Sequence, residues 1–217
     1  MGIKDNLNLI YAKLASSNAD ICAVTKNVGF ERINEAIACG IRIIGENRAQ
    51  ELCEKYDKIN RDDIQIHFIG QLQTNKVKKI IDKIDMIQSV DSVRLAREID
   101  RCAERINRIM PVLLEINTGG EPSKGGIAPD MLFQFAEELQ PLKSIKVTGL
   151  MTVIPNTGDD MENRKFFTRM KVLFDSFAQK YPGASVLSMG MSEDYARAAE
   201  CGATVVRLGR AIFGERK

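Results

Sequence analysis

Short apolar runs alternate with segments of helical periodicity along almost the whole of this 217-residue chain. Eight runs predict strands, one helical segment separates each strand from the next, and no two strands follow each other directly. Such a repeat of β/α units in a chain of this length is typical of a closed parallel barrel. The expected strands are residues 19–27, 41–47, 64–70, 86–90, 110–117, 145–152, 184–189 and 204–208.

The helical segments fit the same architecture. One of them, over residues 3–16, precedes the first strand, and the cleanest, over 92–106, has Ser92 available as its N-cap. An open doubly wound sheet is the alternative, but it usually has fewer strands and a Gly-x-Gly-x-x-Gly turn, which the sequence lacks. We therefore expect an α/β fold, a single (β/α)8 TIM barrel with an extra N-terminal helix, and one domain over residues 1–217. The other helices are expected near residues 30–37, 49–56, 75–84, 130–139, 161–180 and 193–201.

Charge and cysteine content exclude several classes of function. With 31 basic and 29 acidic residues the net charge is +2, which gives no field for binding nucleic acid or an anionic membrane. The basic run Lys76–Lys79 is expected to be a solvated helix face. The five cysteines are far apart and predict reduced, mostly buried thiols rather than a zinc site or disulfides. The N-terminus has no apolar signal core and no run reaches membrane-spanning length, so we expect a soluble, cytoplasmic protein.

Polar residues and glycines follow several of the predicted strands, at the end where barrels build their sites. Lys26 ends the first run, and a lysine amine that is desolvated among apolar neighbours can form a Schiff base with an aldehyde. Turns containing Ser192 and Gly209–Arg210 follow the last two strands and offer backbone N–H groups to an anion. An amine facing a phosphate cradle suggests pyridoxal 5'-phosphate (PLP). The plain alternative is a solvated lysine at the end of a strand.

Seven motifs follow one another along the chain from about Ile21 to Gly214. They are Val24–Lys26, Gly45–Asn47, His67–Gly70 with Leu72–Lys76, Ser123–Gly126, Gly149–Thr152, Leu187–Ser192 with Asp194–Tyr195, and Val206–Gly209 with Ala211–Gly214. Together they resemble the PLP homeostasis protein family. That family is a barrel related to the N-terminal domain of alanine racemase, holds PLP covalently, is not known for catalytic turnover and is implicated in vitamin B6 and amino-acid homeostasis. The resemblance implies an alanine racemase N-terminal-domain-like barrel, PLP as cofactor and a monomer.

By this resemblance, Lys26 carries the Schiff base and Asn47 lies close to the cofactor ring. Ser192 and two backbone N–H groups bind the phosphate. Arg207 faces the pyridine nitrogen, and since a guanidinium has only donors and stays charged, it keeps that nitrogen unprotonated. The ring is then a poor electron sink, which disfavours most amino-acid chemistry. The full set expected to bind the cofactor is Lys26, Asn47, Met191, Ser192, Arg207, Gly209 and Arg210, with no catalytic residue and no metal ligand.

Two positions depart from the family pattern. Gln71 stands where many relatives have a histidine, which leaves fewer acid–base groups near the mouth of the barrel. Arg210 stands where a smaller residue such as threonine is common, and it either adds charge beside the phosphate or points to solvent.

Lys124 is expected to be a mobile surface lysine, with a second aldehyde or phosphate contact as the alternative.

Other residues near the predicted mouth have plainer interpretations. His67, the only histidine, lies in an apolar strand and is expected to be a satisfied core residue rather than a catalytic base. We expect the side chains of Met151, Met189 and Met191 to pack in the barrel rather than contact the cofactor, although Met191 is also among the residues expected to bind the cofactor. Tyr195 suits a phosphate-side hydrogen bond or capping of the barrel rim equally well.

Three functions fit these residues. The first is a PLP-binding carrier or regulator, with PLP-dependent apo-enzymes as candidate recipients; delivery, buffering and sensing of PLP stay open alternatives. A racemase needs an acid–base group opposite the lysine, which related enzymes take from a β-domain and partner subunit. The sequence ends at Lys217, so we expect neither such a domain nor robust turnover. The second is a weak racemase or lyase, with Lys26 as base and Tyr195 or His67 as acid. The third is a barrel aldolase or isomerase on sugar phosphates, in which Lys26 binds the substrate itself.

Overall fold

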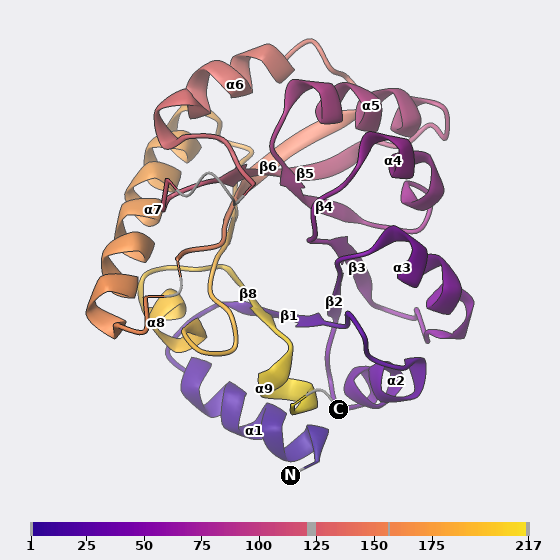
Figure 1. The fold of residues 1–217 in the computed structure, drawn as a ribbon, viewed down its shortest axis with the longest axis vertical. Coiled ribbons are helices and arrows are strands. Elements are labelled where there is room, and N and C mark those ends of the chain that lie inside the picture. The colour runs from indigo at the N-terminus through magenta and orange to yellow at the C-terminus, as the bar shows by residue number, and fades with distance from the viewer. Residues whose placement is uncertain (1, 121–124, 156, 216–217) are drawn as a thin grey trace.

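The computed structural model describes residues 2–120, 125–155 and 157–215 and contains a closed barrel of eight parallel strands (Figure 1). Each strand pairs with the next one along the chain, and β8 pairs with β1, where Cys22 lies opposite Arg207. The predicted fold class is therefore confirmed. The strands are β1 (Asp20–Val24), β2 (Ile43–Glu46), β3 (Gln65–Phe68), β4 (Met86–Val90), β5 (Met110–Ile116), β6 (Ile145–Thr152), β7 (Val186–Ser188) and β8 (Val205–Leu208).

The helices form a ring outside the barrel (Figure 1). The extra N-terminal helix, α1 (Ile3–Leu14), precedes β1 as predicted and lies beside α9 (Arg210–Phe213). Ser92 caps α5 (Val93–Glu104) as expected, since its hydroxyl oxygen accepts from the Leu95 N–H. The remaining helices are α2 (Phe30–Ala38), α3 (Ala49–Lys55), α4 (Thr74–Ile80), α6 (Leu132–Leu139), α7 (Asp160–Lys180) and α8 (Tyr195–Glu200).

The first strand is shorter than the apolar run that predicts it. β1 ends at Val24, because the chain then turns: the Thr25 carbonyl accepts from the Val28 N–H over 3.1 Å, and Asn27 adopts a positive φ of 57°. Lys26 thus lies in a turn that follows the strand. By contrast, the predicted bounds of β4 and β6 agree with the structure.

Three short helical elements and one helix start differ from the prediction. Two 3-10 helices, η1 (Tyr56–Lys58) and η2 (Pro129–Met131), and the four-residue α9 have too few residues to show helical periodicity. α8 begins at Tyr195, two residues later than expected, because the chain first makes a turn in which the Met191 carbonyl accepts from the Asp194 N–H over 3.1 Å.

Cysteine burial is lower than expected. All five cysteines are free thiols, as predicted, but only Cys22 and Cys102 are buried, whereas Cys53 is exposed. In the basic run, Lys78 and Lys79 on α4 are exposed, which confirms a solvated helix face. Within the described ranges, none of the helices combines sufficient length with sufficient hydropathy to cross a lipid bilayer.

Candidate functional site

A cavity of about 510 Å³ opens at the carboxyl ends of the barrel strands. Its lining comes from the segment after β1, the end of β8 and the turns that follow β6, β7 and β8. This volume is in the range of small-molecule sites, and TIM barrels carry their sites at this end. Six of the seven predicted residues line it, namely Lys26, Met191, Ser192, Arg207, Gly209 and Arg210, together with Val24, Ile154, Pro155, Glu193, Asp194 and Glu215.

Ser192 joins the two turns that were predicted to form an anion cradle. Its hydroxyl oxygen accepts from the Gly209 N–H over 3.3 Å and from the Ala211 N–H over 3.2 Å. The preceding turn needs glycine at position 190, where φ is 92° and a Cβ would lie 2.5 Å from the Cβ of Ala198. The turns after β7 and β8 therefore lie side by side and present backbone N–H groups to one point.

The side chain of Arg210 is paired with two acidic residues at the rim of the cavity. It forms an ion pair with Glu193, and its other terminal nitrogen lies 3.9 Å from Glu215. About half of the side chain is exposed. The sequence left open whether Arg210 adds charge beside the phosphate or points to solvent. In the structure the guanidinium is partly exposed and lies in ion pairs at the rim.

Arg207 is buried and begins a chain of hydrogen bonds across the barrel. Its two terminal nitrogens donate to the Ser188 hydroxyl over 2.7 Å and to the Thr152 carbonyl over 2.8 Å. Ser188 in turn donates to the side-chain oxygen of Gln88 over 2.7 Å. Because β4 and β7 are not neighbours in the sheet, this last bond crosses the barrel interior. The guanidinium is therefore fixed in position at the floor of the cavity.

His67 is the next member of this chain and is a satisfied core residue, as predicted. The Gln88 amide donates to His67 Nδ1 over 2.8 Å, so the imidazole proton is on Nε2, which donates to Gln65 over 3.0 Å. Burial lowers the pKa of His67 to about 4, which keeps the ring neutral. With both nitrogens engaged inside the barrel, His67 is not placed to act as an acid at the mouth.

Asn47 is the one predicted residue that does not line the cavity. It follows β2, and its side-chain oxygen is buried without a hydrogen-bond partner among the described residues. Its backbone touches the loop after β3, since a Cβ on Gly70 would lie 2.3 Å from the Asn47 carbonyl oxygen. Gly70 is thus required for close contact between these two loops.

Glu115 on β5 is a charged residue near Arg207 that sequence reasoning did not single out. Burial, with the nearby charge of Asp91, raises the pKa of its carboxyl to about 7, while Arg207 opposes the shift. The only signal in the sequence is a glutamate inside an otherwise apolar strand. Cys22, also near Arg207, has its pKa raised to about 12 by burial, so its thiol is unreactive.

The structure confirms some of the remaining expectations and contradicts one of them. Met151 and Met189 are buried and pack in the barrel as predicted, but Met191 is 39% exposed, so the packing expectation is wrong there. Tyr195 begins α8 and is buried, with the Lys13 ammonium of α1 5.9 Å from its ring centre, which favours capping of the rim. Gln71 is exposed, and Lys124 lies outside the described residues.

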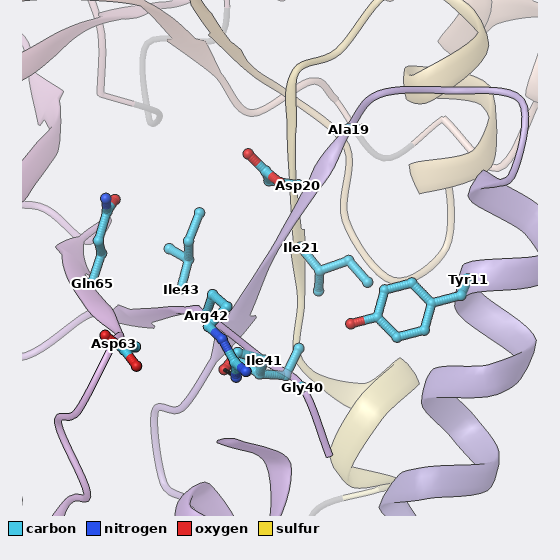
Figure 2. A pocket seen from close by; sticks show the side chains of 10 residues that line it. All are labelled: Tyr11, Ala19, Asp20, Ile21, Gly40, Ile41, Arg42, Ile43, Asp63 and Gln65. Carbon is cyan, nitrogen blue, oxygen red and sulfur yellow. Dashed lines mark hydrogen bonds between the residues drawn. The ribbon is translucent and has the colours of Figure 1, made fainter. Parts of the chain in front are cut away.

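A second cavity, of about 340 Å³, lies at the opposite end of the barrel (Figure 2). Asp20, Ile43 and Gln65, which begin β1, β2 and β3, line it, and the ring of Tyr11 projects toward it from α1. In TIM barrels this end serves stability rather than chemistry. The described side chains also contain no group of three or more His, Cys, Asp or Glu residues placed to hold a metal ion. The cavity at the carboxyl ends is therefore the candidate site.

The fold agrees with the family to which the chain belongs. Residues 2–217 match the family model described as alanine racemase, N-terminal domain, so the chain is a member of that family. A protein of Aquifex aeolicus named pyridoxal phosphate homeostasis protein is 42% identical over 200 residues, which covers 92% of this chain and 88% of that protein. A protein of the same name from Vibrio cholerae is 38% identical over 206 residues, or 93% of this chain and 87% of that protein. Within the larger family, the chain thus belongs to the pyridoxal phosphate homeostasis proteins.

Solved structures show the same barrel. PipY of Synechococcus elongatus, with PLP bound, superposes with a TM-score of 0.89 at 32% identity and covers 98% of this chain and 100% of its own. An alanine racemase of Clostridium difficile superposes with a TM-score of 0.82 at 19% identity and covers 99% of this chain and 57% of its own. At that identity the likeness concerns the fold.

Proposed function

We propose that this protein binds PLP as a Schiff base on Lys26 and acts in intracellular PLP and amino-acid homeostasis without robust turnover of its own. The observation that carries the proposal is that Lys26, Arg207 and the turns containing Ser192 and Gly209 line one and the same cavity. The names of the relatives and the PLP in PipY support it. We further propose that residues 1–217 act as one domain in a cytoplasmic monomer, with PLP-dependent apo-enzymes as candidate recipients of PLP.

The residues present fit PLP group by group. The Lys26 amine would take the aldehyde, and Ser192 with the N–H groups of Gly209 and Arg210 would take the phosphate. Arg207 supplies donors for the pyridine nitrogen, which is an acceptor when unprotonated. Asn47 does not line the cavity, and its place beside the cofactor ring rests on the family resemblance alone. Met191 contributes its exposed side chain to the cavity wall.

The environment of Arg207 favours binding over catalysis. When bound, PLP supplies an electrophilic carbon and, if its ring nitrogen is protonated, an electron sink. Arg207 cannot swing away, since its terminal nitrogens are tied to Ser188 and Thr152. A guanidinium stays charged and offers only donors, so Arg207 would keep the ring nitrogen unprotonated. A racemase or lyase would also need an acid, and neither His67 nor Tyr195 lines the cavity. The carboxylates that do line it are already engaged: Glu193 and Glu215 face Arg210, and Asp194 accepts from the Met191 N–H.

Titration of the purified protein with PLP tests this proposal. After unbound PLP has been removed, we expect the protein to keep a visible absorption band that shifts on borohydride reduction and is missing in Lys26→Ala. Ser192→Ala should weaken binding of PLP more than binding of pyridoxal, which has no phosphate. A protein that is colourless after this treatment would contradict the proposal and favour a Schiff base with a sugar phosphate. Steady turnover of an amino acid by the PLP-loaded, metal-free protein, lost in Lys26→Ala, would favour an enzyme instead.

A further inference from the structure

The turn that contains Lys26 is fixed from one side by a buried ammonium group. Lys55, at the end of α3, is only 7% exposed, and its Nζ donates to the Thr25 carbonyl over 2.8 Å. The same Nζ lies 2.7 Å from a carboxylate oxygen of Glu46 and 3.0 Å from one of Glu51. Each of the three hydrogens of the ammonium thus has an acceptor, and one of the acceptors belongs to the peptide group that precedes Lys26.

The same group of side chains also fixes the peptide that follows Lys26. The Glu51 oxygen that binds Lys55 accepts from the Asn27 N–H over 2.6 Å. Asn27 has a φ of 57° at the third position of the turn closed by the Val28 N–H and the Thr25 carbonyl. A positive φ there is typical of a type II turn, and asparagine tolerates it. Both peptide groups next to the Lys26 Cα are therefore bound to Lys55 or Glu51.

A buried ion cluster is a weak source of stability, because the cost of desolvating the charges opposes their attraction. Here the cluster also fixes the backbone around Lys26. Glu46, at the end of β2, accepts from Lys55 and from the Thr25 hydroxyl, which holds the ammonium in place. The direction of the Cα–Cβ bond of a residue is set by its two flanking peptide groups. Groups that hold both peptides thus set where the side chain points.

We propose that Lys55 and Glu51 are positioning residues for Lys26: by binding both adjacent peptide groups, they direct its side chain toward the cavity. Formation of the Schiff base joins the Lys26 nitrogen to the aldehyde carbon and releases one water. The rate of that step depends on how often the amine lies within reach of the aldehyde, and small misplacements of reacting groups lower rates strongly. The inference rests on the proposed function and adds to it two residues that do not line the cavity.

The test measures how fast Lys26 is modified. The full-length protein is mixed with saturating PLP and quenched with borohydride after increasing times, and mass spectrometry gives the modified fraction of Lys26. Glu51→Ala should lower the rate constant on the order of 10-fold, since it frees the Asn27 N–H and one side of Lys55. Glu51→Gln should restore the rate, because an amide oxygen accepts the same two bonds. Asp175→Ala, which removes the Lys171–Asp175 pair of the same spacing on α7, should leave the rate unchanged.

Saturating PLP distinguishes an effect on the position of Lys26 from an effect on the affinity for PLP. A loss of affinity alone leaves the rate constant for modification of Lys26 at saturation unchanged. Lys55→Met should slow the modification at least as much as Glu51→Ala. Thermal unfolding shows whether the Lys55→Met variant folds. If it does not fold, the rates of the two Glu51 variants alone test the inference. A Glu51→Ala rate equal to that of the unsubstituted protein, or a Glu51→Gln rate as slow as Glu51→Ala, would overturn the inference and leave the Schiff base standing. No modification of Lys26 in the unsubstituted protein would refute the proposed function and this inference with it.

Discussion

Replacing Glu115 by glutamine is expected to stabilise the protein at alkaline pH but not at acidic pH. Folding raises the pKa of this carboxyl from 4.5 to about 7, mainly by burial. The folded protein therefore keeps the proton over a range in which the unfolded chain has lost it, so stability falls as pH rises from about 4.5 to about 7. At about 1.36 kcal/mol per pKa unit, the loss above pH 7 is roughly 3 kcal/mol. Glutamine cannot ionise, so the variant avoids that loss.

Urea unfolding of the PLP-free, full-length protein measures this difference. Relative to the unsubstituted protein, Glu115→Gln should gain less than about 1 kcal/mol of unfolding free energy near pH 5 and about 3 kcal/mol near pH 8. Glu138→Gln makes the same chemical change at an exposed position on α6 and serves as the matched control. Equal effects of Glu115→Gln at both pH values would refute the reasoning.

Two further substitutions test the turn after β7 and the chain of hydrogen bonds in the barrel. Gly190→Ala should lower the unfolding free energy by roughly 1–3 kcal/mol, because φ is 92° and the new Cβ would lie 2.5 Å from that of Ala198; unchanged urea unfolding would contradict it. Ser188→Ala leaves one nitrogen of Arg207 and the side-chain oxygen of Gln88 without a partner, which should cost roughly 1–3 kcal/mol in the same assay and weaken PLP binding. A variant as stable as the unsubstituted protein would show that the chain is not needed.

The fold was predictable because the hydrophobic periodicity and the length of each segment indicate whether it forms a strand or a helix. Eight apolar runs separated by helices leave few alternatives to a closed barrel, and β4 and β6 agree with their runs. The end of β1 was predicted too late: the apolar residues stop at Val24, and the polar residues 25–27, which the prediction included in the strand, form the turn instead. Elements as short as α9 likewise give no periodic signal.

Much of the site was predictable because parallel strands end at one face of the barrel. That rule places Lys26, Ser192 and Arg207 around one cavity without any knowledge of side-chain contacts. It says nothing about charge partners that come from other elements. Lys55 appears in the sequence as the partner of Glu51 in a surface pair at helical spacing, and only the packing of α3 on the barrel brings it to the Thr25 carbonyl.

The position of the PLP adduct shows whether Lys26 forms the Schiff base. After equilibration with PLP, borohydride reduction converts a Schiff base to a stable amine, and peptide mass spectrometry then identifies the modified lysine. We expect one adduct per chain on the peptide that contains Lys26, and none on the corresponding peptide of Lys26→Ala. An adduct confined to another lysine, or undiminished in Lys26→Ala, would contradict it.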